Sequence, residues 1–124
     1  MIFNYFDKVK TTIENYSHII ENYQLNERVY SEARGYIEGE ITFTDDSRLD
    51  FAVVKDIEIN LKIKYHYHYM DSENNLIFRY DNARHYKGIK SFPHHKHLPN
   101  TIEASSEPEI TTVLSEIENR ILKK

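Results

Sequence analysis

The chain has 124 residues, 40% of them hydrophobic, which is enough to bury one core and fits a single domain over residues 1–124. A formal net charge of −4 argues against a general nucleic-acid coat, and the absence of cysteine excludes disulfides, thiolate nucleophiles and sulfur-ligated zinc. No apolar run reaches the ~20 residues of a transmembrane helix and the first residues lack signal-peptide features, so we expect a soluble, cytoplasmic protein without membrane association.

The first 23 residues predict an amphipathic helix. Their apolar side chains recur at alternating steps of four and three residues, which is the helical period. The stripe consists of Ile2, Phe6, Val9, Ile13, Tyr16, Ile20 and Tyr23. It could form a coiled coil, but few charge pairs flank it, and we expect it to pack on a sheet.

An alternation with period two begins at Ile37 and predicts a first β-hairpin. Apolar residues alternate with polar ones on both sides of the turn at 45–47. Pairing Phe43 with Leu49 and Ile41 with Phe51 keeps the apolar side chains on one face. A slip of one residue would scramble that face, so we expect this register.

The alternation is clearer still from Ile59 onward and predicts a second hairpin around the turn at 71–74. We expect three cross-strand pairs on its covered face, Tyr69 with Leu76 and the two aromatic pairs Tyr67 with Phe78 and Tyr65 with Tyr80. The opposite face carries Lys62, Lys64, His66 and His68. There we expect two cross-strand pairs, His66 with Arg79 and Lys64 with Asp81.

Residues 82–100 show no sustained periodicity, so we expect a long loop, a feature that in a small domain favours a functional segment. A closing helix is predicted from the helical spacing of Ile110, Val113, Leu114, Ile117 and Ile121. The sequence therefore predicts an α+β fold: an N-terminal helix, a four-stranded antiparallel β-meander, a long His-rich loop and a C-terminal helix. Both helices should cover the apolar face of the sheet.

The strongest functional signal lies in residues 79–97. These nineteen residues hold four of the seven histidines and five Lys or Arg, with Asp81 as the only acid. Residues 62–97 contain seven Lys or Arg against three Asp or Glu, a local charge of +4. Imidazoles exchange protons near neutral pH, and Lys and Arg stabilise phosphate oxygens. The segment therefore indicates an anion-binding site with acid–base capacity, although basic stretches also occur on ordinary mixed surfaces.

Three chemistries fit the His-His-Lys-His segment at 94–97. In the first, two imidazoles cleave a phosphodiester without metal, and RNA suits this because its 2′-hydroxyl is the nucleophile. In the second, a divalent metal activates water. In the third, the residues only bind phosphate or an acidic partner, as in a non-enzymatic binding or interaction module.

The candidate residues divide by role. The catalytic candidates are His85, His94, His95, His97, Arg79, Asp81 and Lys96, and the phosphate-binding candidates are Lys64, His66, Arg84 and Lys90. We expect the catalytic candidates and His66 to converge in one concave patch, with Asp81 orienting a histidine or pairing with Arg79. The favoured acid–base mechanism needs no cofactor. A metal-dependent one would use Asp81, His85, His95 and His97 as ligands for a divalent ion.

Two sequence blocks are similar to a known family. The segments RYDNARHY (79–86) and FPHHKH (92–97), which follow the two hairpins, resemble the TumE family of bacterial and archaeal toxins over residues 35–118. Three departures from the family pattern are Arg84 in place of the frequent Pro, Asp46-Ser47 in place of Gly-Ser, and Tyr86 in place of a second His. The motif positions that match are Arg79, Tyr80, Asp81, Asn82, His85, Phe92, Pro93, His94, His95, Lys96 and His97.

The resemblance implies a toxin of a type II toxin–antitoxin system. Such a toxin is neutralised by a small protein antitoxin encoded beside it, often one with a helix-turn-helix domain. RNA cleavage is the expectation by analogy with other small toxins. RNA is thus the expected substrate and the antitoxin the expected partner.

Overall fold

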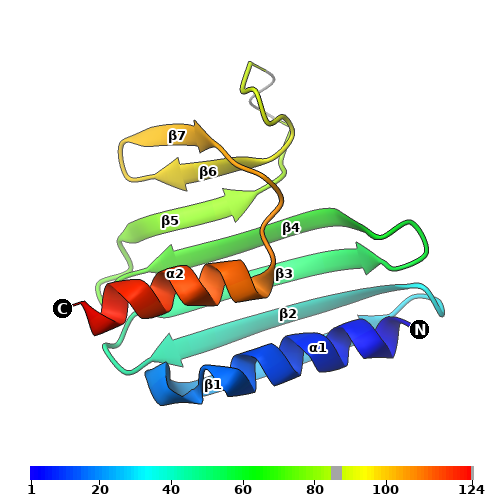
Figure 1. The fold of residues 1–124 in the computed structure, drawn as a ribbon, viewed down its shortest axis with the longest axis horizontal. Helices are drawn as coiled ribbons and strands as arrows, with labels where there is room; N and C mark the ends of the chain where they lie inside the picture. Colours follow the sequence, from blue (N-terminus) through cyan, green and yellow to red (C-terminus); the bar gives the residue numbers. More distant parts are fainter. Residues whose placement is uncertain (85–87, 124) are drawn as a thin grey trace.

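The computed structural model describes residues 1–84 and 88–123. Its elements are α1 (Ile2–Asn15), the 3₁₀ turn η1 (Ser17–Ile19), β1 (Ile20–Val29), β2 (Arg34–Phe43), β3 (Arg48–Asp56), β4 (Leu61–Met70), β5 (Leu76–Asp81), β6 (His95–Leu98), β7 (Thr101–Ala104) and α2 (Ile110–Leu122). The strands form one antiparallel sheet in the sequential order β1 to β7 (Figure 1).

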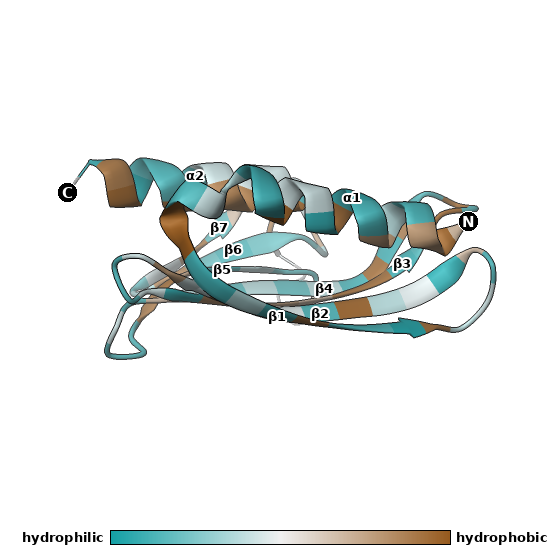
Figure 2. Ribbon diagram, turned by 90° about the horizontal axis from the view of Figure 1, so that it is seen from below, coloured by the Kyte–Doolittle hydropathy of each residue, from teal (hydrophilic) through white to brown (hydrophobic). Residues whose placement is uncertain are grey.

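Both helices lie on the same side of the sheet (Figure 2). Among the described residues no helix covers the other side, which we call the outer face. The predicted helix at each end of the fold and its position over the apolar face are confirmed. The predicted four-stranded meander is wrong, because the sheet has seven strands.

The first additional strand is β1, whose first residues, as far as Tyr23, had been predicted as the end of the first helix. The chain instead leaves the helix after Asn15, turns through η1 and forms a ten-residue strand that pairs with β2. Asn15 and Ser17 favour helix ends over helix interiors because their side chains compete for backbone hydrogen bonds. A longer helix would also have left the edge of β2 without backbone partners.

The other additional strands, β6 and β7, lie at the end of the predicted loop. Each has four residues, and neither shows an apolar alternation. β6 pairs with β5 and β7 pairs with β6, so the His-rich segment becomes part of the sheet. Backbone pairing rather than apolar burial defines these strands, and hydrophobic periodicity does not detect them.

Both predicted hairpin registers are wrong by two residues. Ile41 pairs with Leu49 and not with Phe51, because the loop closes with a hydrogen bond from the Phe43 amide to the Ser47 carbonyl at 2.9 Å. In the second hairpin Tyr67 pairs with Tyr80, and a bulge sets the register between Tyr69 and Met70. A slip of two residues preserves the faces, so the predicted division into covered and outer residues holds away from the bulge. At the bulge, Ile77 packs against the core in place of Leu76, which had been expected on the covered face.

A β-bulge between Val54 and Lys55 reverses the faces at the start of β4. Leu61 and Ile63, expected in the core, are 44% and 40% exposed, whereas Lys62, expected on the outer face, is 1% exposed. The Lys62 ammonium donates to the Pro108 carbonyl at 2.5 Å, which ties β4 to the segment before α2. Burial lowers the pKa of Lys62.

The core lies between the helices and the covered face of the sheet. Its helical residues are Ile2, Phe6, Val9 and Ile13 of α1 and Ile110, Val113, Leu114 and Ile117 of α2. Gly39 allows close packing within β1–β3, since an added Cβ would lie 2.6 Å from atoms of both Leu25 and Phe51. Within the described ranges, no helix has the length and apolarity to cross a membrane.

Candidate functional site

Asp81 is the centre of a cluster on the outer face, and we call Arg79, Asp81, His95 and His97 the Asp81 cluster. The Asp81 carboxylate is 8% exposed and accepts hydrogen bonds from Arg79 Nε at 2.8 Å and from the Ala83 amide at 3.1 Å. Two imidazole Nε2 atoms also approach it, that of His95 at 2.6 Å from Oδ1 and that of His97 at 3.5 Å from Oδ2. One carboxylate thus lies among four nitrogen groups.

The pairing of β5 with β6 creates this cluster. Asp81 lies opposite His95, and Arg79 lies opposite His97. Because side chains alternate along a strand, the two histidines of β6 point to the same face as the two β5 residues. Their rings are 4.7 Å apart in an edge-to-face arrangement.

The two histidines differ in what holds them. His95 is 2% exposed, and its Nδ1 lies 3.0 Å from the Pro93 carbonyl oxygen. Since a carbonyl only accepts, Nδ1 must donate, and Nε2 is the nitrogen left for Asp81. The His97 side chain is 22% exposed, so part of it is accessible to solvent. His95 is therefore a buried, structural member of the cluster, whereas His97 can be reached from solvent.

The electrostatics of the cluster follow from burial and from Arg79. Burial acts to raise the pKa of Asp81, but the hydrogen bonds from Arg79 and Ala83 and the nearby positive charges outweigh it, and the pKa is lowered. Burial lowers the pKa of His97 despite the nearby Asp81 carboxylate. Asp81 is thus an anion and His97 a neutral imidazole at pH 7.

The outer face also places two histidines of β4 beside the cluster. His66 lies opposite Asp81 and His68 opposite Arg79, where the second hairpin had been expected to pair His66 with Arg79 and Lys64 with Asp81. His68 Nδ1 lies 3.3 Å from Arg79 Nη1. Burial, followed by the charge of Arg79, lowers the pKa of both histidines.

His68 was not among the predicted site residues. Its position in the alternation of β4 placed it on the correct face, but the two-residue error in register set His66 beside Arg79 instead.

Other predicted site residues lie elsewhere. Lys96 is on the covered face, where its ammonium binds Glu116 of α2 at 2.6 Å, and Tyr80 donates to the same carboxylate at 2.6 Å. His94 Nδ1 is 2.9 Å from the hydroxyl of the buried Tyr65. The expected convergence is therefore wrong for these two residues, since alternation along β6 separates Lys96 from its neighbours.

The remaining candidates lie near or beyond the ends of β4 and β5. Lys64 is exposed on β4, two residues before His66. Arg84 is exposed, with its guanidinium carbon 5.8 Å from the centre of the Phe92 ring, and Lys90 is exposed in the segment before β6. His85 lies outside the described residues, as does Tyr86.

A shallow concavity of about 470 Å³ borders the Asp81 cluster. Arg79 and His97 line it, together with Leu76 and the turn between β6 and β7. The cluster thus offers a cation and an imidazole to a space that is open to solvent.

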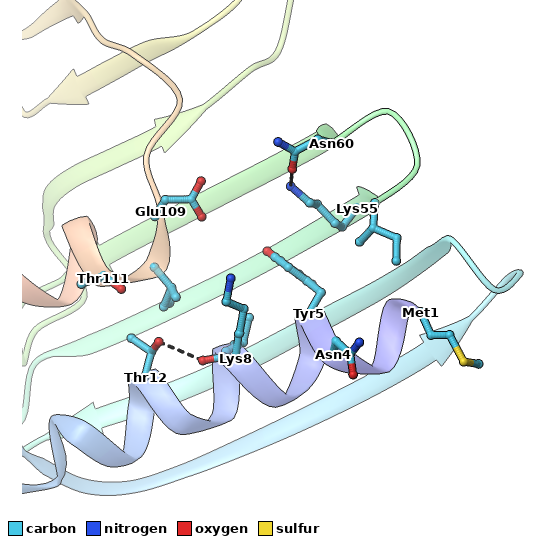
Figure 3. Close-up of a pocket in the computed structure, with 12 residues that line it drawn as sticks. Met1, Asn4, Tyr5, Lys8, Thr12, Lys55, Asn60, Glu109 and Thr111 are labelled. Carbon is cyan, nitrogen blue, oxygen red and sulfur yellow. Dashed lines mark hydrogen bonds between the residues drawn. The ribbon is translucent and has the colours of Figure 1, made fainter.

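A second, larger cavity of about 520 Å³ lies between α1, the start of α2 and the ends of β3 and β4 (Figure 3). Tyr5, Lys8, Lys55 and Asn60 are among its lining residues, and the Lys55 ammonium donates to Asn60 at 3.2 Å. It shares no residue with the Asp81 cluster. The acid–base candidates of the Asp81 cluster therefore lie on the outer face and not in this cavity.

Three side chains of the cluster could hold a metal ion. One ligand atom from each of Asp81, His95 and His97 lies within 4.8 Å of the others. These are three of the four metal-binding candidates from the sequence, and the fourth, His85, is outside the described residues. Two imidazoles and one carboxylate are a donor set suited to Zn²⁺ and similar ions.

Comparison with known proteins identifies one family. The family model described as Toxin TumE matches residues 9–121, which is most of the chain. No curated protein and no solved structure matches the chain.

Proposed function

This chain belongs to the TumE toxin family, and we propose from that premise that it exerts its toxicity by cleaving RNA at the Asp81 cluster. The observation that carries the proposal is a carboxylate that contacts Arg79 and faces His97, while both of these side chains line an open concavity. Family membership alone supports the toxin role, and the chemistry is inferred from these residues.

His97 is the general base in this proposal. A tautomer with its proton on Nε2, toward Asp81, leaves the lone pair on Nδ1 for the 2′-hydroxyl of RNA. The lowered pKa of His97 keeps the imidazole unprotonated at neutral pH, as a base requires. Asp81 is a positioning residue that orients the ring, and general-base catalysis of this kind contributes ~10²–10⁴-fold.

Arg79 and water complete the reaction, and His68 positions Arg79. The 2′-oxygen forms a bond to phosphorus while the bond from phosphorus to the 5′-oxygen breaks, which leaves a 2′,3′-cyclic phosphate and a 5′-hydroxyl. Arg79 stabilises the charge on the phosphoryl oxygens. The 5′-oxygen takes its proton from water, because the lowered pKa of His68 leaves this imidazole neutral at pH 7. His68 accepts from Arg79 at Nδ1 and helps to position the guanidinium.

A toxin of this family implies an antitoxin partner. We propose a small protein of the helix-turn-helix type, which would neutralise the toxin by covering the outer face next to β6, and we place the pair in the cytoplasm. The mechanism proposed here uses no cofactor in the chemical step.

Cleavage of a single-stranded RNA and of its 2′-deoxy counterpart tests the proposal. The protein should cut only the RNA, and His97→Ala should reduce the rate ~10²-fold or more without loss of folding. The matched control is His18→Ala, since His18 is an exposed histidine that contacts Glu118 of α2 on the covered side of the sheet. Equal cleavage by the His97 and His18 variants would contradict the proposal.

The pH profile gives a second test. Rates limited by the His97 base should rise with pH and level off below pH 6.5, the ordinary value for histidine, because burial lowers the pKa of this residue. If the protein arrests growth and binds the RNA and its 2′-deoxy counterpart equally, without cutting either, it is a binding module and not a nuclease.

A further inference from the structure

We propose that Asp81, His95 and His97 form a site for one divalent transition-metal ion such as Zn²⁺, and that occupancy of this site switches off the general base. The second half rests on the proposed function. The first half rests on the geometry of the three side chains alone.

The positions of the ligand atoms come close to those that zinc requires. Zn²⁺ binds imidazole nitrogen and carboxylate oxygen at about 2.0–2.2 Å, which places neighbouring ligand atoms of a tetrahedral site about 3.3 Å apart. His97 Nε2 lies 3.5 Å from Asp81 Oδ2, and His95 Nε2 lies 2.6 Å from Asp81 Oδ1. The three ligand atoms all lie within 4.8 Å of one another, and binding would require the side chains to shift until each pair is about 3.3 Å apart.

The surroundings of His95 and Asp81 support the same conclusion. Histidines that bind metals generally donate the other ring nitrogen to a carbonyl or carboxylate, which fixes the ring and the ligand nitrogen. His95 does this through Nδ1 and the Pro93 carbonyl at 3.0 Å. Asp81 is likewise held by Arg79 and the Ala83 amide. Two of the three ligands are therefore oriented by the fold.

The donor set determines which ions fit. Two imidazoles and a carboxylate favour Zn²⁺, Ni²⁺ and Co²⁺, whereas Mg²⁺ prefers oxygen ligands and keeps its water shell. The partial exposure of His97 leaves one side of the site open for water as a fourth ligand. Mg²⁺ is therefore the natural negative control.

Metal binding and base catalysis exclude each other at His97. A metal ion on Nε2 leaves the single ring proton on Nδ1, where the base needs its lone pair. The ion also neutralises Asp81, which orients the base. A toxin loaded with zinc should therefore be intact and inactive, and a chelator should restore its activity.

Isothermal titration calorimetry on the metal-free, full-length protein tests binding without reference to activity. Wild type and His18→Ala should each bind about one Zn²⁺ per chain and no Mg²⁺. His97→Ala should lose at least ~100-fold in affinity, because even residues that only support a metal ligand are worth 10–100-fold. Failure of wild type to bind Zn²⁺, or equal binding by the His97 variant, would overturn the site.

RNA cleavage with and without Zn²⁺ tests the second half. Saturating Zn²⁺ should abolish cleavage by wild type, and removal of the ion should restore it. Faster cleavage with Zn²⁺ bound would overturn the switch. If the protein cuts no RNA under any condition, the proposed function fails while calorimetry still decides whether the metal site exists.

Discussion

Asp81→Asn should show that the Asp81 cluster contributes more to the free energy of unfolding than other charged pairs on the outer face. The carboxylate is 8% exposed, and it pairs with Arg79 and His95 at 2.8 and 2.6 Å. The Asn oxygen can still accept from Ala83, but its NH₂ would face the donating Nε of Arg79. The variant therefore removes the two interactions of the charged carboxylate, and it leaves the Arg79 guanidinium facing an NH₂ group that cannot accept its hydrogen bond.

The expected loss of stability follows from these contacts. Hydrogen bonds that involve charged groups contribute ~1.5–3 kcal/mol each, and the Arg79 side chain is 33% exposed, so we discount its share and expect a loss of ~3 kcal/mol in the free energy of unfolding. For a domain of this size, ~1 kcal/mol shifts Tm by about 4 °C, so Tm should fall by about 12 °C.

Urea and thermal unfolding followed by circular dichroism provide the measurement. Asp50→Asn is the matched control, because Asp50 lies on the same face and pairs with Arg48 at 3.2 Å, but its side chain is 31% exposed. That pair should contribute less than ~1 kcal/mol. Equal losses for the two variants would refute the argument from burial.

The direction in which stability changes with pH can be measured on wild type and Asp81→Asn. The pKa of Asp81 is lowered in the folded state from an ordinary value of 3.8. Its contribution to stability is therefore complete above pH 3.8 and is lost as the pH falls through the folded pKa. The difference between wild type and Asp81→Asn should shrink below pH 3.8. A difference that stays constant down to pH 2 would contradict the assigned pairing.

Four further substitutions test the fold. Lys96→Met should lower stability by removing the contact with Glu116, yet leave the rate of RNA cleavage unchanged, since Lys96 is on the covered face. Ile63→Ser should change the free energy of unfolding by less than ~0.5 kcal/mol because Ile63 is exposed, whereas Lys62→Ala should cost ~1–3 kcal/mol by leaving the Pro108 carbonyl without its donor. Gly39→Ala should cost ~1–3 kcal/mol through overpacking, as measured by urea unfolding.

The hydrophobic pattern predicted the part of the fold that buries apolar side chains. The first stripe predicted α1 as far as Ile13, and the alternation in β2 to β5 identified most of the covered residues between Ile37 and Tyr80. It could not show that the chain continues past Asn15 as a strand, because Ile20 and Tyr23 extend the helical steps of four and three residues. It also could not reveal the bulge at Val54, which depends on pairing between strands and reversed the expected positions of Lys62 and Ile63.

The candidate site shows a similar division. Arg79, Asp81, His95 and His97 were all proposed from the clustering of chemically active side chains, and the structure brings these four together. The other residues on the same face as these four could be identified only by knowing that β6 is a strand. A segment interpreted as a loop gives no alternation, so Lys96 could not be separated from His97 by sequence alone.

The sequential strand order has a consequence for synthesis on the ribosome. Each strand pairs with the one made just before it, so the sheet can grow in the order in which the chain emerges. Arg79 and Asp81 come early, but His95 and His97 arrive with the last strand but one, and α2 follows them. A nascent or truncated chain that ends before His95 carries the carboxylate and the guanidinium without either imidazole. The harmful activity proposed for this protein would thus be switched on only near the end of translation, when most of the surface that a neutralising partner could bind has already been made.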